Sequence, residues 1–156
     1  MISHGAYLKF MTKKTNPSFR FADHGEITGL IDVISNLSEE EKEKSKKIMA
    51  DRINQNQLIC VIYDNKIAGF IGWAKNYGGD SQSWFIEQIT VKNDLRGNGI
   101  GSKLLSYFLE FCKKEKISSV YASVQNKNER SLNMFRGAGG IITKDKKGDN
   151  IVKFIY

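Results

Sequence analysis

The stretch that most constrains the fold is residues 84–112, where a strand pattern, a run of alternate glycines and a helix pattern follow one another directly. "WFIEQITV" (84–91) is rich in residues that favour strands. Residues 100–112 repeat apolar side chains at helical spacing. The glycines between the two patterns are Gly97, Gly99 and Gly101. A strand that passes through glycines into a helix predicts an α/β fold with an anion site, because free amides at a helix start attract phosphate.

The remaining sequence continues the alternation of strands and helices. Asp23 with Glu26, and Ser38 with Glu41, have the spacing of capping boxes and predict two helices, the second ending near residue 53. Strands are predicted at 19–21, in a hairpin over 58–74 around Asp64-Asn65, and at 84–91, 118–124, 140–144 and 150–156. A short helix is predicted after Asn128, ending at Gly137 or Gly139. Without repeats or a linker, the chain predicts one α/β domain over residues 18–156, preceded by a lead-in at 1–17.

Length and composition favour an ordinary globular domain. The 156 residues are enough to bury a core, and 40% are hydrophobic. No apolar run has membrane-spanning length, and the N-terminus lacks a signal-peptide pattern. Cys60 and Cys112 lie in apolar segments without metal-ligand spacing. We therefore expect a cytoplasmic protein with no bound metal and no membrane partner.

The net charge of +7 favours an anionic partner. Taken alone, it is compatible with nucleic acid, an acidic membrane or a phosphorylated cofactor. Many of the lysines alternate with acids in helical segments such as 41–47 and 113–116, which is typical of a solvated helix face. No basic-aromatic motif accompanies the charge, so nucleic acid is not expected as a partner.

Two familiar phosphate loops do not fit the glycine stretch. A Walker A motif requires Lys after its last glycine, but Ser102 follows Gly101. The dinucleotide fingerprint counted from Gly97 requires Gly or Ala at the position of Ser102, and no acidic residue near 117–121 is present to hold a ribose.

The hexapeptide "RGNGIG" (96–101) has the form [R/Q]-x-x-G-x-[G/A] and resembles the acyl-CoA pyrophosphate loop of the GNAT superfamily of N-acyltransferases. The preceding strand has the family's Ile-x-Val pattern at Ile89 and Val91. The segment 128–140 is similar to the family's second motif, N-x-x-A-x-x-x-Y-x-x-x-G-F. In that segment Asn128 and Gly139 match, whereas Ser131, Phe135 and Gly140 replace the usual Ala, Tyr and Phe.

This resemblance implies a mixed, twisted sheet flanked by helices, in which the fourth and fifth strands (84–91 and 118–124) splay apart to admit CoA. It implies acetyl-CoA as co-substrate, with its pantetheine arm along the fourth strand and its pyrophosphate on the glycine loop. The cofactor-binding residues so implied are Ile89, Thr90, Val91, Arg96, Gly97, Asn98, Gly99, Ile100, Gly101, Ser102, Asn128 and Phe135. Three alternatives remain: Asn128 as a helix cap only, Arg96 as a surface residue, and the glycines as turn residues.

Acyl transfer to an amine benefits from a base, because an alkylamine is almost fully protonated at neutral pH. Glu87 is the candidate general base. Strand alternation would place it on one face with Phe85, Ile89 and Val91, which is unusual for a carboxylate. The alternative is a structural ion pair with a nearby Lys or Arg.

The acid that protonates the departing thiolate is not identified by the sequence. The family's tyrosine is replaced by Phe135, which leaves solvent, Tyr121 or Tyr107 for the role. A thiol pKa near 8.5 makes the thiolate a tolerable leaving group without a strong acid. Neither His4 nor His24 forms a recognisable motif with a cysteine, so direct attack by the amine is predicted.

The resemblance places the acceptor site in residues 24–56, 75–83 and 145–150. Tyr77 and Asp80 lie in the second range, and Trp84 directly follows it. These residues are compatible with a cationic amine, either a small molecule or a group on a protein or peptide, and a homodimer is compatible with the sequence. The favoured function is an acyl-CoA-dependent N-acetyltransferase. The alternative, supported by Phe135, is a catalytically weak or inactive CoA-binding sensor or interaction module of the same fold.

Overall fold

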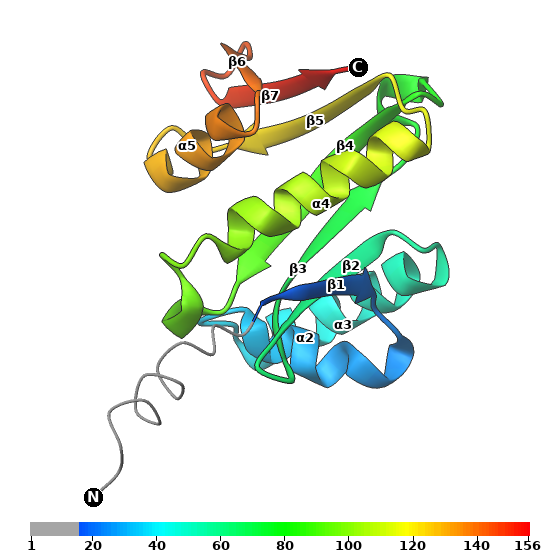
Figure 1. Cartoon of the computed structure of the whole chain (residues 1–156), viewed down its shortest axis with the longest axis vertical. Coiled ribbons are helices and arrows are strands. Elements are labelled where there is room, and N and C mark those ends of the chain that lie inside the picture. The colour runs from blue at the N-terminus through cyan, green and yellow to red at the C-terminus, as the bar shows by residue number, and fades with distance from the viewer. Residues whose placement is uncertain (1–15) are drawn as a thin grey trace, which may run out of the picture.

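The computed structural model describes residues 16–156, so the expected lead-in lies outside the described residues up to Thr15. It contains a seven-stranded sheet in the order β1-β2-β3-β4-β5-β7-β6 (Figure 1). The strands are β1 (Ser18–Phe21), β2 (Leu58–Tyr63), β3 (Lys66–Ala74), β4 (Ser83–Val91), β5 (Ser119–Val124), β6 (Ile141–Lys144) and β7 (Asn150–Ile155). The α-helices are α2 (Ile27–Val33), α3 (Glu39–Asn54), α4 (Ile100–Lys114) and α5 (Glu129–Gly137), and the 3-10 turns are η1 (His24–Glu26), η2 (Tyr77–Gly79) and η3 (Asn93–Leu95). The mixed α/β architecture predicted from the sequence is confirmed.

Local signals explain where several elements begin and turn. The Ser38 hydroxyl accepts from the Glu41 amide at 3.2 Å, and the Glu41 carboxylate accepts from the Ser38 amide at 2.7 Å, which is a complete capping box for α3. Asp64 and Asn65 both have positive φ, at 54° and 60°, which gives the β2–β3 hairpin a two-residue turn that matches the twist of its strands.

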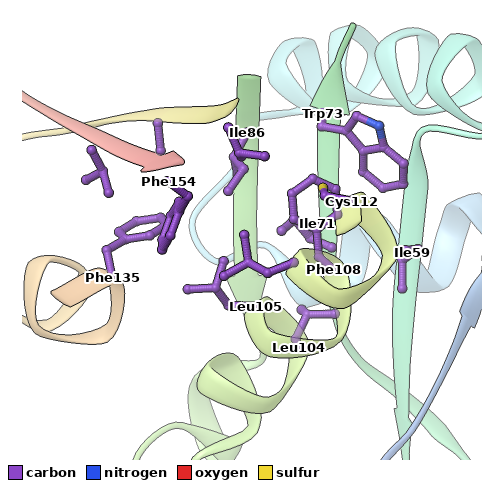
Figure 2. Packing of buried hydrophobic residues seen from close by; sticks show 14 of the residues in the cluster. Ile59, Ile71, Trp73, Ile86, Leu104, Leu105, Phe108, Cys112, Phe135 and Phe154 are labelled. Atoms are coloured by element: carbon purple, nitrogen blue, oxygen red, sulfur yellow. The ribbon is translucent and has the colours of Figure 1, made fainter. Parts of the chain in front are cut away.

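Two layers of helices cover the sheet. Helices α4 and α5 pack on one face, where Leu104, Leu105 and Phe108 of α4 meet Ile71 and Trp73 of β3 (Figure 2). On the other face, α2 and α3 form a second cluster with Cys60 of β2 and Phe70 of β3. That second layer lies against the half of the sheet formed by β2 and β3.

Strands β4 and β5 pair for only part of their length. They are the parallel pair of the sheet, and their register runs from Ser83 opposite Ser119 to Ile86 opposite Ala122. Beyond this point β4 continues to pair with β3 as far as Val91, while β5 continues with β7 (Figure 1). The predicted splay of the two strands is therefore confirmed, and it leaves the β5 side of residues 87–91 without a strand partner.

A bulge in β4 corrects one expectation from the sequence. Gly72 of β3 lies opposite Gln88 and Trp73 lies opposite Ile86, so Glu87 is the extra residue between them. One extra residue reverses the alternation of side chains along a strand. Glu87 therefore reaches toward α3, whereas Ile89 and Val91 pack with the α4 cluster, and the expectation that the three share a face is wrong.

Gly140 allows α5 to approach β7. A Cβ atom at this position would lie 2.6 Å from Val152 Cγ1, 2.9 Å from the Phe135 carbonyl oxygen and 3.1 Å from Phe154 Cζ. We expect Gly140→Ala to lower the free energy of unfolding by about 1–3 kcal/mol, the usual cost of overpacking a core. Gly137→Ala is the control, because its Cβ would meet nothing within 4 Å. Denaturant unfolding that finds Gly140→Ala as stable as Gly137→Ala would contradict this packing.

Candidate active site

A groove of about 540 Å³ opens where β4 leaves β5. Its walls come from the end of β4, the glycine turn, and the first turns of α4 and α5. The residues that line it are Ile89, Thr90, Val91, Leu95, Arg96, Gly97, Gly99, Ile100, Gly101, Ser102, Asn128, Arg130, Ser131, Asn133 and Met134. Ten of the twelve cofactor-binding residues expected from the sequence are thus gathered at one place.

The floor of the groove is a run of unpaired backbone amides. The amides of residues 97–102 donate to no acceptor in the part of the chain that the structure describes. They precede or open α4, whose 15 residues add the partial positive charge of a helix start. Such an arrangement is suited to hold a phosphate or pyrophosphate.

The alternate glycines serve two different purposes. Gly97 and Gly99 have φ values of 84° and 75°, a conformation that other residues adopt only with strain. Gly101 lies instead at a close approach: a Cβ there would be 3.3 Å from Met134 Sδ and 3.5 Å from Val91 Cγ2. Two glycines therefore shape the turn, and the third lets the start of α4 pack between β4 and α5.

Two arginines supply positive charge at the groove. Arg96 reaches back from the turn, and its Nε donates to the Val91 carbonyl at 3.1 Å. Arg130 lines the opposite wall from the first turn of α5. Arg130 is not among the cofactor-binding residues expected from the sequence, although its position two residues after Asn128 in the second motif is a usable signal.

The backbone of β4 presents free hydrogen-bonding groups to the groove. The Lys92 amide donates to Ala68 of β3 at 2.8 Å. Because backbone groups alternate in direction along a strand, the amides of Ile89 and Val91 point away from β3 and toward the splay. This strand edge can accept an extended ligand arm as an added strand.

Asn128 caps α5 and also lies at the groove. Its Oδ1 accepts from the Ser131 amide at 3.2 Å, so it caps α5. It also lines the groove.

Asn98 and Phe135 are the two expected residues that lie outside the groove lining. The Asn98 side chain donates to the Leu95 carbonyl at 3.0 Å and braces the turn. Phe135 is 3% exposed and points from α5 into the core, with its ring 6.2 Å from that of Phe154 (Figure 2).

Glu87 stands at the point where β4 and β5 part, directly after the last paired residue, Ile86. Its side chain is 37% exposed, and its Oε1 lies 2.5 Å from Nε of Arg52, near the C-terminal end of α3. The Nε–H is not aligned with an acceptor among the described residues, so the contact is an ion pair rather than a directed hydrogen bond. The carboxylate is thus available at the surface and paired with a guanidinium.

The two candidate tyrosines have different surroundings. Tyr107 stacks on Phe19 with ring centroids 4.9 Å apart, on a part of α4 outside the groove lining. Tyr121 lies on β5 opposite Phe85, close to the splay. The neighbouring Lys153 ammonium lowers the pKa of Tyr121 by stabilising its phenolate. Position favours Tyr121 over Tyr107 as a proton donor near the groove.

The expected acceptor loop is only partly exposed. Trp84 is 3% exposed and stacks on Trp73, so its assignment to an acceptor surface is wrong. It belongs to the paired start of β4 and faces α4. Asp80 accepts from the Gln82 amide and the Ser83 hydroxyl, which makes it a turn residue. Tyr77 is 40% exposed and stacks on Phe85, so it remains accessible.

Neither cysteine has the properties of a reactive thiolate. Burial raises the pKa of Cys60 to about 11 and that of Cys112 to about 12, so both thiols are neutral near pH 7. Both are buried in the packed clusters of the sheet faces. His24 contacts Asn54, not a cysteine. Within residues 16–156, no three His, Cys, Asp or Glu side chains gather closely enough to hold a metal ion.

A sheet that splays at a groove floored by glycine-loop amides is the arrangement of an acyl-CoA-dependent acyltransferase. The sequence profile of the acetyltransferase (GNAT) family matches residues 18–139. The chain therefore belongs to the GNAT family of acetyltransferases. No curated protein sequence matches the chain significantly.

Solved structures share the fold at low sequence identity. PaiA N-acetyltransferase from Thermoplasma acidophilum, in complex with coenzyme A, superposes with a TM-score of 0.76 at 18% identity, covering 90% of this chain and 99% of that one. Ribosomal-protein-alanine N-acetyltransferase from Brucella melitensis gives 0.74 at 18% identity, covering 89% and 99%. The putative acetyltransferase YncA from Salmonella typhimurium, with its cofactor acetyl-CoA, gives 0.74 at 15% identity, covering 90% and 94%. In residues 16–156, no helix has the length and apolar character needed to cross a membrane.

Proposed function

We propose that this protein transfers an acetyl group from acetyl-CoA to a primary amine by direct attack of the amine on the thioester. The observation that carries the proposal is the joint position of two features. The free amides of residues 97–102 form an anion site in the groove. Glu87 stands on β4 two residues before the groove residue Ile89, at the point where β4 and β5 part.

The groove fits acetyl-CoA by its chemistry. The glycine-loop amides, with Arg96 and Arg130 beside them, complement a pyrophosphate. The amides of Ile89 and Val91, which point toward the splay, complement the carbonyl groups of the pantetheine arm. A ligand extended from the loop along β4 would place its thioester at the splay, within the reach of groups around Glu87.

Glu87 supplies the base in this scheme. Keeping an alkylamine neutral at pH 7 costs roughly 4–5 kcal/mol, because its pKa is near 10.4. Glu87 takes a proton from the ammonium, directly or through one water, and the neutral amine attacks the thioester carbonyl. The carbon–sulfur bond breaks as the amide forms, and the thiolate leaves with the electron pair. Solvent or Tyr121 then protonates the sulfur, the second amine proton passes to water, and Glu87 returns its proton to solvent.

Turnover of acetyl-CoA against a panel of primary amines tests the proposal. The panel contains a polyamine, an aminoglycoside, free lysine and short peptides with free N-termini. Free thiol is measured with and without each amine, and the acetylated product is identified by mass. The expected result is amine-dependent release of CoA in a 1:1 ratio with product. Tight binding of acetyl-CoA without release for any amine would instead favour the alternative, a CoA-binding module.

A further inference from the structure

Arg52 is the feature of the site that acetyl transfer itself does not explain. It lies near the end of α3 with a side chain that is only 19% exposed, and it is the ion-pair partner of Glu87. Arg52 Nη1 donates to Gln57 Oε1 at 2.9 Å, so two of its nitrogens have defined neighbours. The guanidinium is therefore fixed at both ends before any ligand arrives.

Gln57 ties this arginine to the β-bulge. It is a buried polar residue, 5% exposed, whose amide donates to the Arg52 carbonyl at 2.8 Å. Its own carbonyl accepts from the Trp73 amide at 3.1 Å. Trp73 is the β3 residue at which the register with β4 shifts, so that Glu87 has no paired residue on β3. One connected network thus joins the end of α3, the irregular β3–β4 pairing and the carboxylate.

We propose that Arg52 is a positioning residue that holds one oxygen of Glu87 and leaves the other oxygen for the amine. Oε1 is the oxygen beside Arg52, and Oε2 has no partner among the described residues. This inference rests on the proposed function, because it assigns a role to the partner of the proposed base. The arginine touches neither substrate in this scheme; it acts through Glu87.

Stability alone does not account for this ion pair. Partly exposed pairs usually contribute about 0–1 kcal/mol to stability. The other ion pairs along α3, such as Lys44 with Glu40 and Lys46 with Glu43, are exposed pairs within one helix. Arg52 with Glu87 instead crosses from α3 to the bulged strand at the splay, where a displaced carboxylate would lose contact with the reacting amine.

The test is a double-mutant cycle in the full chain with acetyl-CoA and the best amine of the panel. We expect Arg52→Met to lower kcat roughly 10–100-fold, because a misplacement of about 1 Å can cost 10²-fold. The dissociation constant for acetyl-CoA should stay within about twofold, since Arg52 does not line the groove. In a Glu87→Gln background, Arg52→Met should change kcat by less than about twofold, because the group it positions is already gone.

Two further variants test the positioning role even if Arg52→Met does not fold. Arg52→Lys retains the charge without the fork geometry, and it should recover part of the kcat. Arg20→Met is the matched control. Arg20 lies on the outer strand β1 and pairs with both oxygens of Glu26 in η1, so the loss of the Arg20 guanidinium should leave kcat unchanged. Melting temperatures of all variants report stability separately from rate.

Two results would overturn the positioning role. One is an Arg52→Met enzyme with normal kcat per folded molecule and only a lower melting temperature. The other is a double variant in which Arg52→Met lowers kcat by the same factor in the Glu87→Gln background as in the wild type. Failure of the proposed function gives a different result, because the wild-type chain would then release no CoA with any amine. That result would overturn the positioning role as well.

Discussion

Ser102→Glu is expected to weaken acetyl-CoA binding roughly 10²–10³-fold while leaving the fold intact. Ser102 is the exposed third residue of α4 and lines the groove beside the free amides. A carboxylate about 4 Å from a pyrophosphate costs about 4 kcal/mol at an effective dielectric of 20. That energy corresponds to roughly 10²–10³-fold in the dissociation constant. The same carboxylate suits the helix start, where acids contribute about 0.3–1 kcal/mol, so the free protein should be no less stable.

Ser106→Glu is the matched control for this charge. It adds the same group to an exposed position one turn later on α4, outside the groove lining. For the wild type and this control, acetyl-CoA at 100 times its dissociation constant should add about 2.7 kcal/mol of stability, seen as a higher melting temperature. The same concentration should give almost no shift with Ser102→Glu. Equal shifts for both variants would contradict the location of the anion site.

Glu87→Gln is expected to lower kcat by roughly 10²–10⁴-fold, the usual contribution of a general base. The substitution keeps the size of the side chain and removes its basicity. Affinity for acetyl-CoA should hardly change, because the groove meets the cofactor with backbone groups of Ile89 and Val91 and with the glycine loop. The rate of the variant should rise toward high pH, because the solution then supplies the neutral amine that Glu87 supplies in the wild type.

Glu26→Gln is the control for the loss of an arginine-paired glutamate. Glu26 pairs with Arg20 away from the splay, and that arginine lowers the pKa of the Glu26 carboxyl. Its loss should lower stability and leave the pH profile of kcat unchanged. If Glu87 serves only as half of a structural ion pair, Glu87→Gln will behave like Glu26→Gln, with a lower melting temperature and an unchanged pH profile. That result would remove Glu87 from the mechanism.

The sequence predicted the strands, the helices and the glycine turn well, because local chemistry specifies them. Capping pairs such as Ser38 with Glu41 set helix starts, and the turn at Asp64-Asn65 sets the hairpin. The glycine run could be interpreted for the same reason. Positive φ at Gly97 and Gly99 is a property of the turn itself.

The features that escaped prediction all depend on contacts between distant segments. The bulge at Glu87 arises from pairing with β3, which no periodicity within β4 reveals, so the face shared by Glu87 and Ile89 was assigned wrongly. An ion pair of Glu87 with a Lys or Arg was left open by the sequence, but Arg52 could not be identified as the partner, because the contact requires the end of α3 to lie beside β4. Trp84 was assigned to the acceptor surface because it stands where a loop meets a predicted strand, yet its side chain lies in the core.

The most direct test of the account is to follow a labelled acetyl group from acetyl-CoA in one reaction with the full chain and an amine of the panel. Rapid quenching would measure the label on the amine, the label on the protein and the free CoA thiol. We predict that the label appears on the amine in step with CoA release, with none on the protein at any time, including at Cys60 and Cys112. Label on the protein before the amine would contradict direct attack, and acetyl-CoA that stays bound and intact with every amine would contradict catalysis itself.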